Sequence, residues 1–356
     1  MLFSKVTIDA FGYELPANVL LSEDLEDRLE PLYEKLHFQK GQLEALTGVQ
    51  ERRLWDPGFT MTEGAVRAGR KALAAASISV DDIGMLVYGG VCRDWLEPAT
   101  ACEIAHQLGM APENQLYDLS NACLGVLNGM LQIANAIELG QVRAGMVLSC
   151  ESSRSIIDVS VRRLLANPDM GLFKRSIATL TGGSGAVAVI LTDAVSNVHG
   201  HRLAGGVVRS APAFYDLCRW GSGPALSPTG EEVMETDSVA VLTNGVSLGV
   251  DTFTALKKEL QWDGNKPDKV ICHQVGATHQ RTILGELGIP AHKDFTTFAY
   301  LGNIGTVSLP ITAAIAHERG FLKPGEPVGF LGIGSGLNCL MLGVEWNCEK
   351  TGSHLP

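Results

Sequence analysis

The chain has 356 residues, a formal net charge of −11 and a sequence pI near 5.3. Apolar residues make up 46% of it and charged residues 19%, so the chain can bury a large core, which excludes intrinsic disorder. The acidic balance argues against nucleic-acid binding, because binding to a phosphate backbone needs a basic footprint. The length predicts two domains or two fused halves rather than one small module.

Two uncharged stretches, 119–137 and 328–344, could be mistaken for membrane spans. Polar residues interrupt the first and five glycines interrupt the second, so we expect both to be buried parts of a soluble core. The first residues show no export signal, and the eight cysteines form no C-x-x-C pair. We therefore expect a cytoplasmic protein without integral membrane association, a disulfide framework or a metal cluster.

Helical stretches and short apolar runs alternate along the chain, which predicts a mixed α/β fold. The apolar runs are continuous, as in strands that helices cover on both faces. In chain order we predict a helix over 23–36, a helix over 62–76 with Thr62 as its N-cap, a strand over 85–88, a helix over 125–139, and strands over 146–148 and 186–191.

The order of elements recurs in the second half. A helix over 247–260 and a strand over 270–272 correspond to the first helix–strand pair of 62–88. In each half, 116–150 and 295–334, a strand, a polar turn, a small-residue helix, a turn and a strand then follow. We call these polar turns the elbows. Two such units, packed together, would bring both elbows to one central site, whereas chance similarity of two strand–helix–strand units is the alternative.

Cys123 in the first elbow is the leading candidate nucleophile. It lies between a predicted strand and a helix that begins near Leu124, and a helix N-terminus favours the thiolate and lowers the thiol pKa. The crowded turn around it resembles a nucleophile elbow. The alternative interpretation is a small buried hydrophobe, which is the role of most free cysteines.

Three further positions could serve the same site. His273 follows the strand over 270–272, at the carboxyl end where ligands of α/β folds gather, and could donate to a thioester oxygen or accept a proton. Asn303 stands between glycines in the second elbow, and its amide could donate to that oxygen. Backbone N–H groups of the loop 332–339 could form an oxyanion hole. A strand-capping histidine, a turn asparagine and tight packing around a strand are the structural alternatives. Glu97, taken alone, is typical of a solvated loop residue.

The ordered set of motifs resembles the thiolase superfamily, and within it the ketoacyl synthase III branch of condensing enzymes. The matching segments are TGVQERRLW, SNACLG, GGSGAVAVIL, HQV, GNIG and GIGSGLN, spread from Thr47 to Asn338. The resemblance implies a five-layered αβαβα thiolase fold of two duplicated halves and a homodimer. It implies an N-terminal half, 1–195, that carries the nucleophile Cys123, and a C-terminal half, 196–356, that carries His273 and Asn303.

Two departures narrow the branch to the OleA subfamily. Carrier-protein-dependent synthases read His-Gln-Ala-Asn where this chain has residues 273–276 as His-Gln-Val-Gly, and the segment 93–100 and the ending GIGSGLNC look like OleA. Those enzymes join two fatty acyl-CoA molecules head to head and give a 2-alkyl-3-ketoacid for olefin biosynthesis. The resemblance implies that Glu97 acts as the base in the partner subunit's site, and that the N–H groups of Cys123 and Ser335 form the oxyanion hole. It implies that the substrate is acyl-CoA and that no cofactor is needed. It also allows downstream biosynthetic enzymes as partners.

Three alternatives stay open at this point. A ketoacyl synthase III would condense acyl-CoA with a malonyl-carrier protein and release CO₂. A thioesterase or acyltransferase would pass the acyl-cysteine to water, an alcohol or an amine. The third alternative is a non-catalytic acyl-binding homologue. The presence of Cys123, His273 and Asn303 together argues against it, because a scaffold protein need not keep all three. Acyl chains would lie in apolar channels, for which the segments 156–177 and 211–228 are plausible coverings.

Overall fold

The computed structural model describes residues 1–347 apart from 198 and 228. Nine strands form one sheet in the order β11-β12-β13-β8-β1-β7-β6-β4-β5, and two further strand pairs, β2-β3 and β9-β10, stand apart from it. The strands are β1 (Val6–Glu14), β2 (Asn18–Leu21), β3 (Glu51–Leu54), β4 (Met85–Gly89), β5 (Gln115–Leu119), β6 (Ala144–Glu151), β7 (Gly185–Asp193), β8 (His201–Ser210), β9 (Cys218–Gly221), β10 (Val233–Thr236), β11 (Lys269–Cys272), β12 (Glu326–Gly334) and β13 (Asn338–Trp346).

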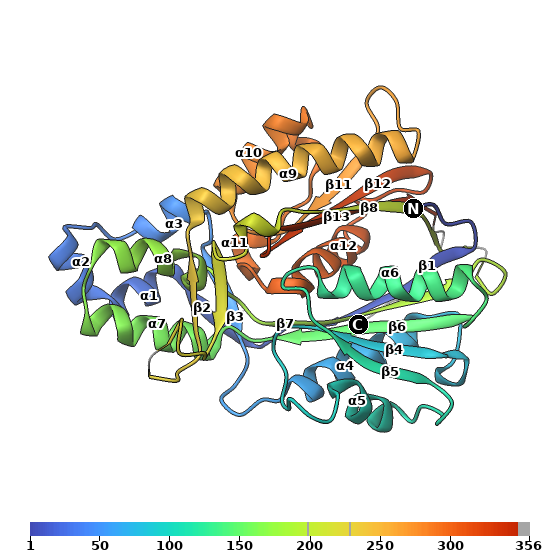
Figure 1. The fold of residues 1–356 in the computed structure, drawn as a ribbon, viewed down its shortest axis with the longest axis horizontal. Helices are drawn as coiled ribbons and strands as arrows, with labels where there is room; N and C mark the ends of the chain where they lie inside the picture. The colour runs from blue at the N-terminus through green and yellow to red at the C-terminus, as the bar shows by residue number, and fades with distance from the viewer. Residues whose placement is uncertain (198, 228, 348–356) are drawn as a thin grey trace.

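The helices cover both outer faces of the folded sheet and fill the space between its halves (Figure 1). The helices are α1 (Ser22–Arg28), α2 (Glu30–Leu36), α3 (Gln42–Thr47), α4 (Met61–Ala75), α5 (Thr100–Leu108), α6 (Gly125–Glu138), α7 (Arg154–Ala166), α8 (Met170–Leu180), α9 (Ser238–Glu259), α10 (Ala277–Leu287), α11 (Phe298–Leu301) and α12 (Ser308–Glu318).

The two halves of the sheet meet at a short antiparallel pairing of β1 with β8, through Thr7 with Arg202 and Ile8 with His201. On either side of this pairing the sheet halves face each other across α6 and α12 (Figure 1). Helices α4 and α5 cover the outer face of one half, and α9 and α10 that of the other. The order helix, sheet, helix, sheet, helix is the five-layered thiolase fold, which confirms the expected fold class.

The predicted repeat has a structural counterpart in these two halves. Helix α4 packs on β1 as α9 packs on β8, and the central helices α6 and α12 each follow an elbow. Strand β4 is parallel to β5 and β6, and β11 is parallel to β12. The first elbow therefore lies at the carboxyl end of a parallel strand, β5, and the second elbow follows helix α11 (Phe298–Leu301).

Four local expectations need correction. Thr60, not Thr62, caps α4, because its side chain accepts the Glu63 N–H at 3.1 Å. The predicted helix over 23–36 breaks at Leu29 into α1 and α2, and the helix expected over 247–260 begins earlier, at Ser238.

The fourth correction concerns the strand expected before the second elbow. The residues there form the short helix α11 instead. The side-chain oxygen of Gln274 accepts the N–H groups of Thr297 and Phe298 at 2.8 and 3.1 Å, so a side chain takes the donors that a strand ladder would use.

Both uncharged stretches lie in the core, as expected. Helix α6 is buried between the sheet halves. Most apolar side chains of β12 and β13 lie either in the apolar cluster that contains α6 or in a second cluster that contains residues of α9. Among the described residues one helix, α9, is long and apolar enough to cross a membrane by length and composition alone. It packs against β8 and β13 along part of its surface.

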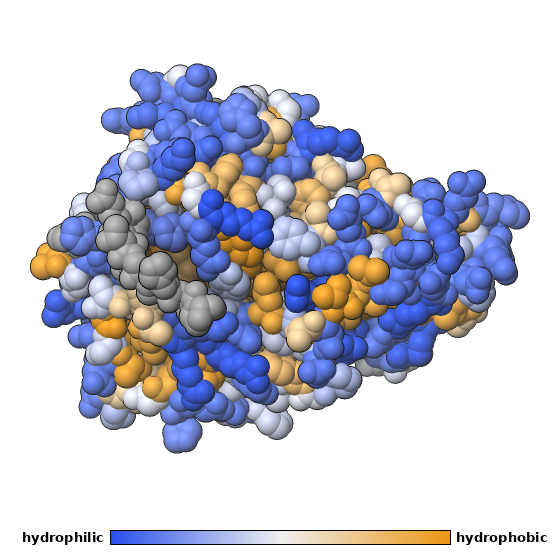
Figure 2. Space-filling model, turned by 180° about the vertical axis from the view of Figure 1, so that it is seen from behind, coloured by the Kyte–Doolittle hydropathy of each residue, from blue (hydrophilic) through white to orange (hydrophobic). Residues whose placement is uncertain are grey.

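A helical cap stands at one end of the layered body. It comprises α1, α2, α3, α7 and α8, with the pairs β2-β3 and β9-β10 beside it (Figure 1). Its own apolar cluster includes Leu25, Leu32, Ile157 and Phe173. The face opposite to the view of Figure 1 is largely hydrophilic but carries several hydrophobic patches (Figure 2).

Candidate active site

The first elbow positions Cys123 at the junction of β5 and α6. Ala122 adopts φ 46°, a left-handed conformation that costs energy for any residue with a Cβ. The turn is closed by the Leu124 N–H, which donates to the Asn121 carbonyl at 2.9 Å. Gly125 passes so close to β4 that a Cβ there would lie 2.6 Å from the Gly89 oxygen. The glycine is therefore required for α6 to start where it does.

The second elbow positions Asn303 with two left-handed glycines, Gly302 (φ 67°) and Gly305 (φ 60°). Its backbone is held by Thr181 and Gly183: the Asn303 N–H donates to the Thr181 oxygen at 2.9 Å, and the Gly183 N–H donates to the Asn303 oxygen at 3.0 Å. The side-chain Oδ1 accepts the Gly305 N–H at 3.1 Å. The Nδ2 group is therefore the end of this amide that can donate to a substrate oxygen.

Side chains and close backbone contacts join the two elbows. Thr306, just after the second elbow, accepts the Val126 N–H in the first turn of α6 at 2.8 Å. The loop after β12 also reaches the first elbow, because a Cβ on Gly334 would lie 3.4 Å from the Cys123 nitrogen. Asn338 fixes this loop by donating to the Asn121 side chain at 3.1 Å and to the Ser335 carbonyl at 3.2 Å.

A cavity of about 250 Å³ lies where these segments meet. Of the residues expected at the site, it brings together Cys123, Asn303 and Ser335. The lining is completed by Val91, Ser120, Ala122, Glu151, Ser153, Ile156, Ala178, Thr179, Gly182, Cys218, Trp220, Met234, Gly305 and Thr306. The loop 332–339 is thus close enough to the nucleophile to present its backbone N–H groups to the same substrate atom.

The prediction that the helix N-terminus lowers the pKa of Cys123 is wrong for the folded chain. Burial raises the pKa of the Cys123 thiol to about 12, and the neighbouring Cys218 and Glu151 act in the same direction. Only the backbone hydrogen bond of Cys123 itself lowers this pKa. The thiol therefore holds its proton at neutral pH.

His273 lies at the end of β11, where its N–H donates to the Leu331 oxygen at 3.1 Å. The side chain is buried and lines a separate cavity of about 20 Å³ with His279 and Gly332, rather than the lining of the Cys123 cavity. Burial lowers the pKa of His273 to about 3, and His279 adds to the effect. At neutral pH the ring is therefore an uncharged imidazole that can donate an N–H.

Glu97 does not reach the cavity of its own chain. It lies in an exposed loop between β4 and α5, beside Trp95 and Leu96, which are 58% and 93% exposed. Exposed apolar side chains of this size mark surfaces that contact another molecule.

One residue of the cavity, Glu151, was not foreseen, and Cys218 was expected only as part of the covering segment 211–228. Glu151, the last residue of β6, is a buried carboxylate in the cavity lining, and burial raises its pKa. Cys218 of β9 supplies a second thiol to the same lining. The signal for Glu151 is its position directly after the apolar run that ends at Cys150, at the carboxyl end of a strand parallel to β4. The same argument selected His273.

One wall of the cavity comes from the helical cap and from β9-β10. The expected covering segments 156–177 and 211–228 contribute Ile156, Cys218 and Trp220 to the lining, while Ala178, Thr179 and Met234 lie outside them.

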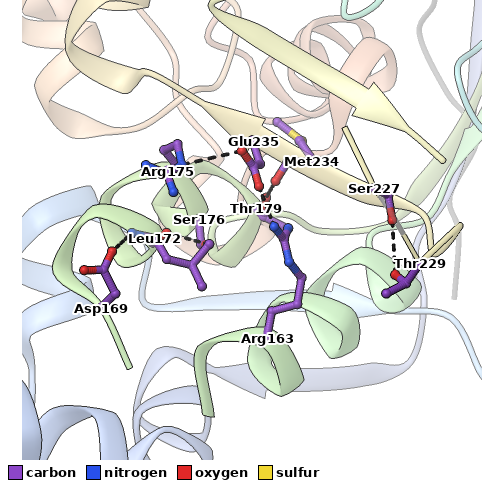
Figure 3. Close-up of polar contacts among 10 residues, drawn as sticks. All are labelled: Arg163, Asp169, Leu172, Arg175, Ser176, Thr179, Ser227, Thr229, Met234 and Glu235. Carbon is purple, nitrogen blue, oxygen red and sulfur yellow. Dashed lines mark hydrogen bonds and ion pairs between the residues drawn. The ribbon is translucent and has the colours of Figure 1, made fainter. Parts of the chain in front are cut away.

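Strand β10 is fastened to α7 and α8 as Figure 3 shows. The Thr179 hydroxyl donates to the Met234 carbonyl at 3.2 Å. Glu235 accepts from Arg163 at 2.5 Å and lies 3.5 Å from Arg175, so one carboxylate pairs with a guanidinium from each helix. This half-buried network fixes the wall that Met234 and Thr179 present to the cavity.

Comparison with known proteins places this site in a family. Residues 258–346 match the family model of the 3-oxoacyl-[acyl-carrier-protein] synthase III C-terminal domain. Over 97% of its length the chain is 52% identical to the acyl-CoA:acyl-CoA alkyltransferase of Shewanella oneidensis and 34% identical to that of Xanthomonas campestris, covering 100% of each. The chain belongs to the OleA family.

A solved OleA structure supports this membership. Xanthomonas campestris OleA, in a variant with a cysteine replaced by serine and with lauric acid and lauroyl-CoA bound, superposes with a TM-score of 0.91. The two chains are 34% identical over 97% of this chain and 100% of that one. The resemblance drawn from the motifs is thereby confirmed. The OleA family consists of acyltransferases within the thiolase-fold condensing enzymes.

Proposed function

We propose that the chain condenses two fatty acyl-CoA thioesters without decarboxylation and forms a 2-alkyl-3-ketoacid. The observation that carries this proposal is the convergence of Cys123, Asn303 and Ser335 on one cavity, in a chain 52% identical to an acyl-CoA:acyl-CoA alkyltransferase. The bound lauroyl-CoA of the Xanthomonas campestris OleA supports a fatty acyl-CoA as the substrate class.

The first half-reaction transfers an acyl group to Cys123. The sulfur attacks the thioester carbonyl of the first acyl-CoA, the carbon–sulfur bond to CoA breaks, and an acyl-cysteine forms. The proton of the Cys123 thiol is transferred to the departing CoA sulfur, which leaves as CoA–SH. The reaction therefore does not require Cys123 to be a thiolate beforehand. The N–H groups of Cys123 and Ser335 are assigned to the carbonyl oxygen, on which negative charge develops.

The second half-reaction needs a carbanion at the α-carbon of another acyl-CoA. No carboxylate leaves to create it, so a base must remove a proton, and we assign this role to Glu97 of the partner subunit. We assign the donors to the enolate oxygen to the Nδ2 group of Asn303, which lines the Cys123 cavity, and to the uncharged His273, which lines the separate small cavity in one chain. The carbanion attacks the acyl-cysteine carbonyl, the Cys123 sulfur leaves, and water then cleaves the remaining CoA thioester.

The partner role of Glu97 makes a homodimer part of the proposal. In a single chain Glu97 is exposed and flanked by exposed apolar side chains, as expected of a segment that enters a neighbouring subunit. We also keep the division into 1–195 and 196–356, which falls between β7 and β8, a cytoplasmic location, and a reaction that uses no cofactor besides its acyl-CoA substrates. Downstream biosynthetic enzymes would consume the ketoacid.

The experiment is incubation of the purified protein with myristoyl-CoA alone and with malonyl-carrier protein added. The proposal requires CoA release and, after spontaneous decarboxylation of the ketoacid, a symmetric ketone in the first reaction. A carbon–carbon product that depends on the malonyl thioester favours the ketoacyl synthase III activity. CoA release without such a product favours a thioesterase or acyltransferase.

A further inference from the structure

Glu151 holds a backbone segment outside its own strand. Its Oε1 accepts the Val91 N–H at 3.0 Å, and its Oε2 accepts the Cys92 N–H at 3.2 Å. The residue is only 3% exposed, and burying a carboxylate is costly unless its oxygens accept hydrogen bonds. Two successive N–H groups, one for each oxygen, fix both the carboxylate and the segment that donates them.

The opposite side of Glu151 faces the second elbow. A Cβ placed on Gly305 would lie 3.5 Å from its Cγ and 3.6 Å from its Cδ, an ordinary packing distance. Glu151 lines the same cavity as Cys123 and Asn303. Glu151 thus binds the segment at 91–92 at the cavity wall itself, because Val91 also lines this cavity.

The segment at 91–92 is also fixed by a phenol. The Tyr88 hydroxyl lies 2.5 Å from the Cys92 carbonyl oxygen and 3.0 Å from the Cys150 carbonyl oxygen, within hydrogen-bond distance of both. Tyr88 is fully buried. Residues 91–92 are therefore tied to the end of β6 through their amide groups by Glu151 and through a carbonyl by Tyr88.

This attachment lies five residues before Glu97. The next residue but one after Cys92, Asp94, accepts the N–H groups of Met61 and Thr62 at 2.8 Å each and so caps the start of α4. Beyond Asp94 residues 95–98 are exposed, Ala99 is half-buried, and α5 begins at Thr100. The loop that carries Glu97 thus starts from backbone held by Glu151, which among the described residues is the carboxylate that lines the catalytic cavity.

We propose that Glu151 is a positioning residue that sets the place of Glu97 by holding the Val91–Cys92 backbone from inside the Cys123 cavity. The inference rests on the proposed function, because it requires Glu97 to be the base of the condensation. It goes beyond that function by assigning a role to a residue at the carboxyl end of the neighbouring parallel strand β6. A group that served to activate the nucleophile would favour the thiolate, whereas Glu151 disfavours it. Positioning therefore fits the geometry better than activation of Cys123.

The test separates the two half-reactions in the purified full-length protein. Acylation of Cys123 is measured as the acyl adduct by intact mass and as the initial burst of CoA release. Condensation is measured as ketone formed from myristoyl-CoA. For Glu151→Gln we expect acylation within about threefold of wild type and condensation reduced at least tenfold in kcat, because the amide keeps one acceptor oxygen but loses the second. Glu151→Asp, which keeps both acceptors on a shorter side chain, should recover part of the condensation.

Glu138→Gln is the matched control. Glu138 also accepts two successive N–H groups, those of Ser4 and Lys5 at 3.0 Å each, but it lies on the surface away from the cavity. This variant should keep both half-reactions. Tyr88→Phe is the second variant on the same frame, and it should lower condensation more than acylation without changing any charge. If neither Glu151→Gln nor Tyr88→Phe changes the ratio of condensation to acylation, the proposal is wrong.

Glu97→Gln distinguishes failure of this inference from failure of the proposed function. Unchanged condensation in Glu97→Gln overturns the role of Glu97 itself, whatever Glu151 does. If Glu97→Gln lowers condensation to a measurable residual rate, the double variant Glu97→Gln/Glu151→Gln should retain the same acylation as Glu151→Gln and keep that residual rate of condensation. A further fall in condensation in the double variant would mean that Glu151 acts independently of Glu97, contrary to the inference.

Discussion

The hydroxyl of Thr306 accepts the Val126 N–H at 2.8 Å, and this bond joins the second elbow to the first turn of the helix behind Cys123. Thr306 belongs to one structural half and Val126 to the other, 180 residues apart. Both are buried. The two repeats are therefore linked at the site itself as well as through their shared apolar core.

Replacing Thr306 with valine should destabilise the protein by about 1–3 kcal/mol, because a buried N–H loses its acceptor while the volume is kept. Urea denaturation measures this difference. The control is Thr254→Val, on the exposed side of α9, where the hydroxyl donates only to the carbonyl one turn before it. That variant should change the free energy of unfolding by less than about 0.5 kcal/mol. Equal stability of the two variants would contradict the role given to Thr306.

The raised pKa of Cys123 predicts slow alkylation of the unliganded protein. With a thiol pKa of about 12 instead of 9.0, the thiolate fraction at pH 8 is about a thousandfold smaller than for an unperturbed thiol, so the rate with iodoacetamide should still rise with pH above 9. Peptide mass spectrometry follows Cys123, with the exposed Cys102 as internal reference. In Glu151→Gln the rise should move to lower pH, because a negative charge that disfavours the thiolate is gone. A plateau below pH 8 would show that the thiolate is the resting form.

The lowered pKa of His273 predicts a loss of stability on acidification. The unfolded chain protonates this histidine near pH 6.5, whereas the folded chain resists until about pH 3. The free energy of unfolding is therefore unaffected by this histidine above about pH 6.5 and decreases as the pH falls toward 3. At pH 5 the decrease is about 2 kcal/mol. Asp294 opposes this, since burial raises its pKa to about 6 and the folded chain then binds that proton first.

The difference between wild type and His273→Gln isolates the histidine. Urea denaturation at pH 7 and pH 5 should show the wild type losing about 2 kcal/mol more than the variant over this interval. Parallel losses in the two proteins would mean that His273 titrates alike in the folded and unfolded chains.

The assignment of Glu97 to the partner's site predicts complementation between two inactive variants. Cys123→Ala retains Glu97 but cannot be acylated, and Glu97→Ala can be acylated but lacks the base. If the two are unfolded together and refolded as a mixture, about half of the dimers are mixed, and each has one complete site. Ketone formation should recover to about a quarter of the wild-type rate. Each variant refolded alone is the control, and no recovery in the mixture would contradict action across the interface.

The repeat predicted that the elbows of Cys123 and Asn303 meet, because order and spacing are preserved between the halves, whereas Ser335 was expected from the resemblance and His273 lines a separate cavity. The sequence did not predict the pKa of Cys123, which depends on a wall that includes Cys218, 95 positions away in the chain. The strand expected before the second elbow was wrong because one side chain, that of Gln274, takes the backbone donors there. Such competition depends on a tertiary contact that no local pattern records.

Glu151 escaped prediction for a related reason. At the end of an apolar strand a glutamate normally marks the passage to solvent, and here the donors that satisfy it come from Val91 and Cys92, about sixty positions earlier. Glu97 was recognised only through the resemblance to OleA, since its own surroundings in one chain are those of an exposed loop.

The proposed condensation requires that both halves of the product come from acyl-CoA. Its most direct test is incubation of the protein with an equal mixture of lauroyl-CoA and myristoyl-CoA, without any malonyl thioester, and analysis of the ketones by mass spectrometry. Condensation of two acyl-CoA molecules should yield three ketones, two symmetric and one mixed, with two CoA molecules released for each ketone formed. Absence of ketones in this mixture, with a carbon–carbon product only after a malonyl thioester is added, would contradict it.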